Sequence, residues 1–216
     1  MNDYEKYKGN FLKRNYMGEL INDNGLEYQS RVGHWPEAEQ LTDNSIELAN
    51  FLNSNNLLQD DINIFEIGSG GCRNLFYINK INENINFFAN DLNKESSFKA
   101  MHQIMKDKVT FYEEDTLSLI KNFNSRVNIN ILISSDHLMH LPEIAVVEIL
   151  EYLKTEIKPK YILLRELFSD LGQSFNRTWP KIHHQYDFGN VYKLIDSKKC
   201  QNNGEQYSLK LYKLEN

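Results

Sequence analysis

Between residues 62 and 167 the sequence alternates short apolar runs with longer stretches in which apolar residues recur at every third or fourth position. The short runs, rich in Ile, Val and Phe, indicate buried strands, and the periodic stretches indicate helices. Strands are predicted at residues 62–67, 85–91, 109–115, 127–135 and 160–167, and helices at 72–81, 94–107, 116–123 and 143–157. Strands that alternate with helices form a parallel sheet covered on both faces. This rhythm therefore predicts a doubly wound α/β fold.

Both ends of the chain depart from this rhythm. Residues 1 to about 58 are predicted to be mostly helical, and one helix starts at Asp43 or Asn44. The apolar face of that helix comprises Ile46, Leu48, Ala49, Phe51 and Leu52. Near the C-terminus, apolar runs at 191–200 and 207–215 flank the turn sequence QNNGEQ. We therefore expect an N-terminal helical extension and an antiparallel edge at the C-terminal side of the sheet.

Composition limits the class of protein. The 216 residues suffice for one sizeable core, and 30 acidic against 24 basic residues give a net charge of −6. This balance argues against a nucleic-acid partner, because binding phosphates requires a basic stripe. There is no apolar run of the roughly 18 residues needed to cross a membrane, and the first residues do not resemble a secretion signal. We expect a cytoplasmic protein with neither a nucleic-acid nor a membrane partner.

The segment FEIGSGGCRN, residues 65–74, places Glu66 and three glycines between the first strand and its helix. Ligands of doubly wound sheets bind beyond the carboxyl ends of the strands. Gly68, Gly70 and Gly71 permit positive φ there and let a ligand approach bare backbone. The N–H groups of the following helix favour a carboxylate or a phosphate. A turn that merely packs strand against helix would explain the same glycines.

Two familiar phosphate-binding patterns do not fit this segment. The dinucleotide fingerprint G-x-G-x-x-G requires a third glycine where the chain has Arg73. A P-loop requires Gly-Lys-Ser or Gly-Lys-Thr, which does not follow the glycines. Both observations argue against NAD, FAD and a nucleoside triphosphate.

Acidic residues also end the second and third predicted strands. Asp91 can accept hydrogen bonds from both hydroxyls of a ribose, or it can cap the helix predicted at 94–107. Asp115 closes the third strand in the same way. Three strands that end in acids at one edge of the sheet exceed what packing requires.

Taken in order, these segments resemble the class I S-adenosylmethionine (SAM)-dependent methyltransferases. FEIGSGGCRN is similar to their first motif, an acid followed by G-x-G-x-G, and FFANDLN to their ribose-binding strand end. VTFYEEDTL resembles the adenine-contacting motif, and ILISSDHLMHLP the motif of the fourth strand. The resemblance implies a Rossmann-like domain at residues 59–216 that binds SAM and releases S-adenosylhomocysteine (SAH). It also implies that residues 1–58 cap the active site.

The resemblance carries specific roles for the cofactor site. It implies that Glu66, Gly68 and Gly70 line the methionine end of the cofactor, that Asp91 binds the ribose and that Asp115 lies near adenine. Arg73 opens the helix, where it meets the cofactor's carboxylate or lies at the surface. The other cofactor-site candidates on these motifs are Ser69, Leu92, Thr116 and Ser134. Cys72 replaces the family's third glycine, and we expect Gly71 to supply the flexibility.

The segment SSDHLMHLPE provides the candidates for acid–base chemistry. It lacks the Asn/Asp-Pro-Pro-aromatic signature of the DNA amino-methylating enzymes and the Pro-Cys nucleophile of the cytosine C5 enzymes. His137 is the predicted base, because a histidine can take a proton from a hydroxyl at neutral pH. Asp136 is its orienter or an alternative base, and His140 is a further candidate. A structural role for each histidine is the competing interpretation.

Aromatic and hydrogen-bonding side chains suggest where the acceptor binds. The predicted substrate residues are Tyr28, Arg31, His34, Trp35, Arg165, His183 and His184, and Glu166 ends the same strand as Arg165. Such a mixture suits a polyhydroxylated or aromatic molecule, and it also suits an ordinary packing patch. Asp136, His137, His183 and His184 could hold a divalent metal that acidifies a hydroxyl. Their spacing does not require this, and no metal site is predicted.

We therefore expect a methyltransferase for a small molecule, acting on the hydroxyl of a sugar-type or secondary-metabolite acceptor. The alternatives are an N-methyltransferase acting on a protein or an amine, and a catalytically silent SAM-binding subunit. A homodimer is left open.

Overall fold

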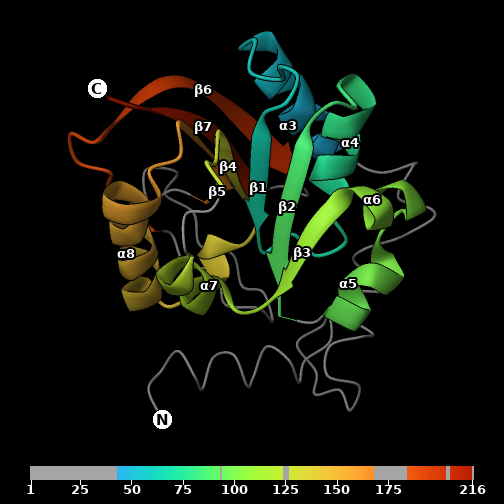
Figure 1. Cartoon of the computed structure of the whole chain (residues 1–216). Helices are drawn as coiled ribbons and strands as arrows, with labels where there is room; N and C mark the ends of the chain where they lie inside the picture. The colour runs from blue at the N-terminus through green and yellow to red at the C-terminus, as the bar shows by residue number, and fades with distance from the viewer. Residues whose placement is uncertain (1–42, 93, 124–126, 168–183, 203–204, 216) are drawn as a thin grey trace.

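The computed structural model describes residues 43–92, 94–123, 127–167, 184–202 and 205–215 (Figure 1). Most of the predicted extension at residues 1–58 lies outside these ranges. The predicted substrate residues Tyr28, Arg31, His34, Trp35 and His183 also lie outside the described residues. The extension, its role as a cap and the boundary at residue 58 stay predictions.

The described residues form one seven-stranded sheet of strand order β3-β2-β1-β4-β5-β7-β6. The parallel strands are β1 (Asn63–Ile67), β2 (Asn86–Asp91), β3 (Val109–Glu113), β4 (Ile131–Ser135) and β5 (Tyr161–Glu166). The antiparallel strands are β7 (Glu205–Leu214), which pairs with β5, and the outer strand β6 (Tyr192–Asn202). The predicted parallel sheet with an antiparallel C-terminal edge is confirmed.

The strand order reverses at β1, which pairs with β2 on one side and β4 on the other. In this register Ile67, the last residue of β1, lies between Asn90 of β2 and Ser134 of β4. In open α/β sheets, ligands bind outside the carboxyl ends of the strands at such a switch point. The glycine segment begins one residue beyond Ile67, so the fold delivers it to this position.

Helices cover both faces of the sheet (Figure 1). On one face, α3 (Asp43–Ser54), α4 (Arg73–Ile81) and α6 (Gln103–Lys108) contribute buried side chains to a core with Ile64, Ile131 and Leu163. On the other face, α7 (Thr116–Asn122) and α8 (Glu143–Tyr152) pack over Phe65, Leu132 and Leu164. The apolar residues of each strand thus alternate between two cores, as a sheet covered on both faces requires.

Two predicted helices are divided in the structure. The helix predicted at 94–107 is two helices, α5 (Lys94–Ala100) and α6, separated at Met101 and His102. His102 has extended backbone, and its Nδ1 accepts the N–H of Ile104 at 3.2 Å, so it caps α6 rather than continuing α5. The helix predicted at 143–157 ends as α8 at Tyr152 and continues as a π-helical turn, Leu153–Ile157.

Two smaller expectations were wrong. The strand predicted at 127–135 begins only at Ile131. Ile46 is 41% exposed and does not belong to the apolar face of α3, whose buried residues are Ser45, Leu48, Ala49, Phe51 and Leu52. The polar Ser45, rather than Ile46, lies on the buried side of this helix.

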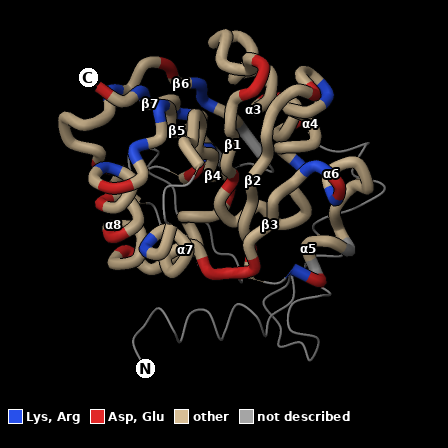
Figure 2. The backbone as a smooth tube through the Cα atoms, viewed as in Figure 1, with Lys and Arg blue, Asp and Glu red and all other residues tan. Residues whose placement is uncertain are grey.

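Strand β6 forms one outer edge of the sheet, with β3 at the opposite edge. Lys193, Lys198 and Lys199 are exposed on it, and Figure 2 shows basic positions along β6 and β7. A bulge between Leu194 and Asp196 interrupts its pairing with β7. Within the described ranges, no helix is both long and apolar enough to span a membrane.

Candidate active site

The loop after β1 uses three left-handed residues in alternation. Gly68, Gly70 and Cys72 have φ values of 62°, 51° and 56°. The expectation that Gly71 would supply the flexibility of the family's third glycine was wrong, because Cys72 itself adopts the left-handed conformation. Its side chain is fully buried, and its Sγ lies 3.6 Å from Ser69 Oγ. Core packing thus holds a non-glycine residue where the backbone favours glycine.

Asp91 and its neighbour Asn90 hold this loop from β2. The Asp91 carboxylate accepts the N–H of Gly70 at 3.0 Å. The buried Asn90 amide accepts the N–H of Gly68 at 3.3 Å and donates to the carbonyl of Glu114 at 2.9 Å. Glu113, rather than Asp91, accepts the N–H of Lys94 at the start of α5. The geometry therefore places Asp91 at the glycine loop, where its role at a ribose stays a prediction.

His137, which lies just beyond β4, packs against Gly68. A Cβ atom at Gly68 would lie 2.1 Å from the His137 ring, so a glycine is required there for this contact. The His137 Nε2 lies 2.8 Å from Thr116 Oγ1. Burial, reinforced by His140, lowers the pKa of His137 to about 3. The ring is therefore neutral at physiological pH.

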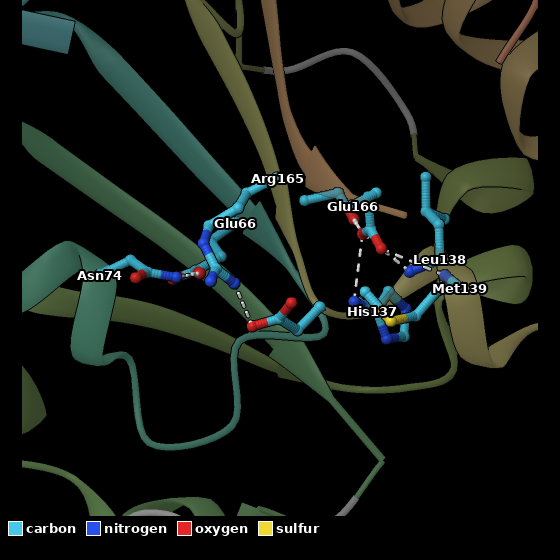
Figure 3. A network of polar contacts seen from close by, with 9 residues as sticks. Glu66, Asn74, His137, Leu138, Met139, Arg165 and Glu166 are labelled. Carbon is cyan, nitrogen blue, oxygen red and sulfur yellow. Dashed lines mark hydrogen bonds and ion pairs between the residues drawn. The ribbon is translucent and has the colours of Figure 1, made fainter. Parts of the chain in front are cut away.

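Glu66 is buried on β1 beside this loop (Figure 3). Its Oε1 accepts a hydrogen bond from the Asn74 amide at 2.5 Å, whereas Oε2 has no hydrogen-bond partner among the described residues. Burial raises the pKa of Glu66 to about 7, although Asn74 and Arg73 favour the ionised form. A buried carboxyl oxygen without a hydrogen-bond partner is suited to accepting a hydrogen bond from a ligand.

Arg165 at the end of β5 is 1% exposed and forms an ion pair with Asp136 through Nη1. Asp136 follows β4 and has a φ of 56°. Burial opposes the charge on Arg165, but Asp136 prevails and raises the pKa of the guanidinium. Figure 3 shows Arg165 beside Glu66 and Asn74.

Glu166, the next residue of β5, anchors the turn that carries the histidines. Its Oε1 accepts hydrogen bonds from Ser134 Oγ at 2.6 Å and from the N–H groups of His137 and Leu138 at 3.1 and 3.0 Å. Its Oε2 accepts the N–H of Met139 at 3.2 Å (Figure 3). Burial raises the pKa of Glu166 to about 7 against these hydrogen bonds, which favour the carboxylate.

The remaining candidate site residues either stabilise the loops after the strands or support the turn that carries the histidines. Asp115 caps α7 by accepting the N–H of Ser118 at 3.0 Å, and its place near adenine stays a prediction. Ser69 Oγ donates to the Asn90 carbonyl at 3.2 Å, and Leu92 lies half-buried just beyond β2. The buried His184 donates from Nε2 to the Leu141 carbonyl at 3.1 Å, so it supports the end of the turn formed by residues 138–140.

Among the described residues, neither a metal site nor a hollow at the opposite edge of the sheet competes with this position. In the part of the chain that the structure describes, no three His, Cys, Asp or Glu side chains gather to hold a metal ion, and His183 lies outside that part. An open hollow lined by Asp60, Asn63, Asn84 and Lys108 lies at the amino ends of β1 and β2. Ligands of parallel sheets bind at the carboxyl ends, so the hollow is not the candidate site.

Sequence reasoning missed three residues that build this site. Asn90 precedes the predicted ribose-binding Asp91, Asn74 lies in the predicted helix, and Glu166 ends the predicted strand. A signal was present for two of them. Asn90 and Glu166 are polar residues near the ends of apolar runs predicted to be buried strands, and a buried polar side chain requires hydrogen-bond partners.

No protein-family model matches the chain, and no curated protein matches its sequence. Solved structures do match, and they define the class of fold. The strand order, the antiparallel β7 and the glycine loop at the switch point constitute the Rossmann-like fold of class I methyltransferases.

Three of these structures illustrate how similar the fold is and how low the sequence identity is. The 1,6-didemethyltoxoflavin-N1-methyltransferase of Burkholderia thailandensis, with SAH bound, matches with a TM-score of 0.67 at 12% identity, covering 100% of this chain and 92% of that one. The N-methyltransferase NodS of Bradyrhizobium japonicum, also with SAH, has a TM-score of 0.59 at 14% identity, and 100% of each chain is covered. A putative O-methyltransferase of Nostoc punctiforme has a TM-score of 0.63 at 12% identity, with coverage of 97% and 68%.

Proposed function

We propose that the protein is a SAM-dependent methyltransferase that acts on a hydroxyl of a small molecule. The observation that carries the proposal is the set of groups at the carboxyl ends of β1 and β2. A carboxylate (Asp91) lies within hydrogen-bond distance of the glycine loop, and a buried carboxyl oxygen (Glu66 Oε2) has no partner among the described residues. An acid for a ribose diol and an acceptor for an ammonium group fit the ribose and the amino-acid tail of SAM.

The residues that hold the cofactor in this proposal follow from that placement. Asp91 binds the ribose hydroxyls, Glu66 and the loop from Gly68 to Gly70 enclose the methionine end, and Asp115 and Thr116 border the adenine. When bound, SAM supplies an electrophilic methyl group, and the protein orients the acceptor and excludes water. The SAH bound to the toxoflavin enzyme and to NodS supports this choice of cofactor.

His137 is the proposed base for a hydroxyl acceptor. Its lowered pKa keeps the ring neutral, which a base requires, and also makes it a weak proton acceptor. A weak base suffices, because a hydroxyl becomes far more acidic as its oxygen gains a methyl group. Asp136 and His140 border the same turn and remain the alternatives.

The acceptor class rests on charge and on what the sequence lacks. A net charge of −6 and the absence of nucleic-acid methyltransferase signatures favour a small-molecule acceptor, such as a sugar-type or secondary-metabolite hydroxyl, over a nucleic acid. An amine acceptor is the second candidate, because two of the similar structures are N-methyltransferases. Product analysis on matched alcohol and amine acceptors separates the two, and SAH binding without turnover on either would indicate a silent subunit.

Titration calorimetry with SAH tests the cofactor assignment. We expect wild type to bind SAH and Asp91→Asn to bind it at least about tenfold more weakly, because charge-assisted hydrogen bonds to a diol contribute roughly 1.5–3 kcal/mol. Asp107→Asn, which alters an exposed aspartate of α6, serves as the control and should leave the affinity unchanged. Failure of folded wild type to bind SAH, or equal affinities for all three proteins, would reject the assignment.

A further inference from the structure

Arg165 presents an unmatched hydrogen-bonding edge inside the protein. It lies at the level of Ser135 on β4 and of Leu209 on β7, and its side chain is 1% exposed. Its Nη1 donates to Asp136, and its Cζ lies 4.6 Å from the centre of the Tyr207 ring. Its Nε and Nη2 are buried and have no hydrogen-bond partner among the described residues.

A purely structural role for Arg165 leaves this edge unexplained. The ion pair uses Nη1, and the stacking on Tyr207 uses the face of the guanidinium. Burying donors without partners costs about 1–3 kcal/mol for each group, so a structural arginine would be expected to have its remaining N–H groups satisfied. The ring contact and the ion pair instead hold the guanidinium in place and leave Nε and Nη2 directed elsewhere.

We infer that the Nε–Nη2 edge of Arg165 binds a carboxylate of a ligand. Two parallel N–H groups of a guanidinium match the two oxygens of a carboxylate, and such a pair is both strong and specific in orientation. Asp136, the other half of the ion pair, is 41% exposed, so the cluster extends from the buried guanidinium to the surface. The inference rests on the proposed function, because it assigns the carboxylate to either of the two ligands of a methyltransferase.

The carboxylate has two possible sources, the methionine tail of the cofactor and the methyl acceptor. Arg165→Lys distinguishes them, because lysine keeps the charge and the ion pair with Asp136 and removes the two-pronged edge. Calorimetry compares SAH with 5′-methylthioadenosine, the same adenosyl thioether without the amino-acid tail. With SAH saturating, a second titration compares hydroxy acids, including 4-hydroxybenzoate and D-glucuronate, with their methyl esters.

We expect Arg165→Lys to lose about 10- to 100-fold in affinity for the ligand that carries the carboxylate and to bind its tail-less or esterified counterpart as wild type does. Weaker SAH binding with unchanged methylthioadenosine binding assigns the carboxylate to the cofactor. Unchanged SAH binding with a lost preference for acids over esters assigns it to the acceptor.

The inference is overturned if two results are obtained together. The variant and wild type bind SAH with equal affinity, and the ratio of their affinities for acids and for the matching methyl esters is also the same, whether or not that ratio departs from one. It is also overturned if SAH and methylthioadenosine weaken by the same factor, because a general structural role has that effect. Thermal unfolding of the variant checks that it is folded. Wild type that binds neither adenosyl compound would instead reject the proposed function.

Discussion

Cys72 shows how a single residue can depart from a glycine pattern without changing the backbone. Its φ of 56° is the conformation that glycine adopts at low cost, and its side chain is fully buried in the core formed with α3 and α4. The strain of a left-handed Cβ and the gain from burying the thiol therefore oppose each other. The site tolerates the departure because packing compensates for the backbone.

This balance predicts an unusual order of stability for two small substitutions. Both Cys72→Ala and Cys72→Gly remove the buried sulfur, and they differ by one Cβ in the left-handed conformation. We expect Cys72→Gly to be about 1 kcal/mol more stable than Cys72→Ala in urea unfolding, the reverse of the order in a helix interior. If the alanine variant were the more stable, the strain assigned to Cys72 would be absent.

At the scale of elements, the turn formed by residues 138–140 depends on the strand beneath it. Glu166 accepts hydrogen bonds from three successive backbone N–H groups and from Ser134 Oγ. His184 binds the carbonyl at the far end of the turn. The ring of His137 is thereby held over Gly68, so β5 orients a side chain that β4 delivers.

We expect Glu166→Gln to destabilise the protein by about 1–3 kcal/mol, because the amide nitrogen of glutamine would face a backbone N–H and leave a buried donor unmatched. Turnover should fall further than the loss of folded protein explains, since His137 loses its anchor. Glu156→Gln alters an exposed glutamate and should change the free energy of unfolding by less than about 0.5 kcal/mol. Equal stability of the two variants would show that the carboxylate does not hold the turn.

The sequence predicted the elements better than it predicted the contacts between them. The order of strands and helices follows from apolar periodicity, which is a local property. The left-handed conformations of Gly68 and Gly70 follow from their residue type, whereas that of Cys72 does not. The breaks at His102 and after Tyr152 depend on tertiary packing, which can override helix periodicity. Asn90 and Glu166 acquire their roles from residues more than 20 positions away, and no local pattern encodes such pairs.

For the molecule as a whole, three buried titratable groups give stability an unusual dependence on pH. Burial raises the pKa values of Glu66 and Glu166 to about 7, which favours the folded protein at low pH. Burial lowers the pKa of His137 to about 3, so His137 destabilises the folded protein as the pH falls below 6.5. These contributions oppose each other between about pH 4.5 and 6.5.

Comparing wild type with Glu66→Gln isolates one of these contributions, because Glu166 and His137 titrate in both proteins. As the pH rises from 4.5 to about 7, the unfolded chain releases the Glu66 proton before the folded protein does. The free energy of unfolding of wild type should therefore fall relative to the variant, by on the order of 3 kcal/mol. Urea unfolding at several pH values measures this difference, and a difference that is constant or grows with pH would contradict the raised pKa.

The outer strand β6 has a consequence for how copies of this protein meet. An open strand edge offers its backbone groups to any chain that can extend the sheet. Here Lys193 and Lys199 are exposed, Lys198 is exposed and paired with Glu47 of α3, and the bulge between Leu194 and Asp196 distorts the line of backbone groups. If two identical molecules approached each other along β6, lysines would face lysines and the bulge would misalign their backbone hydrogen-bonding groups. This edge of the sheet therefore resists fibre-like growth.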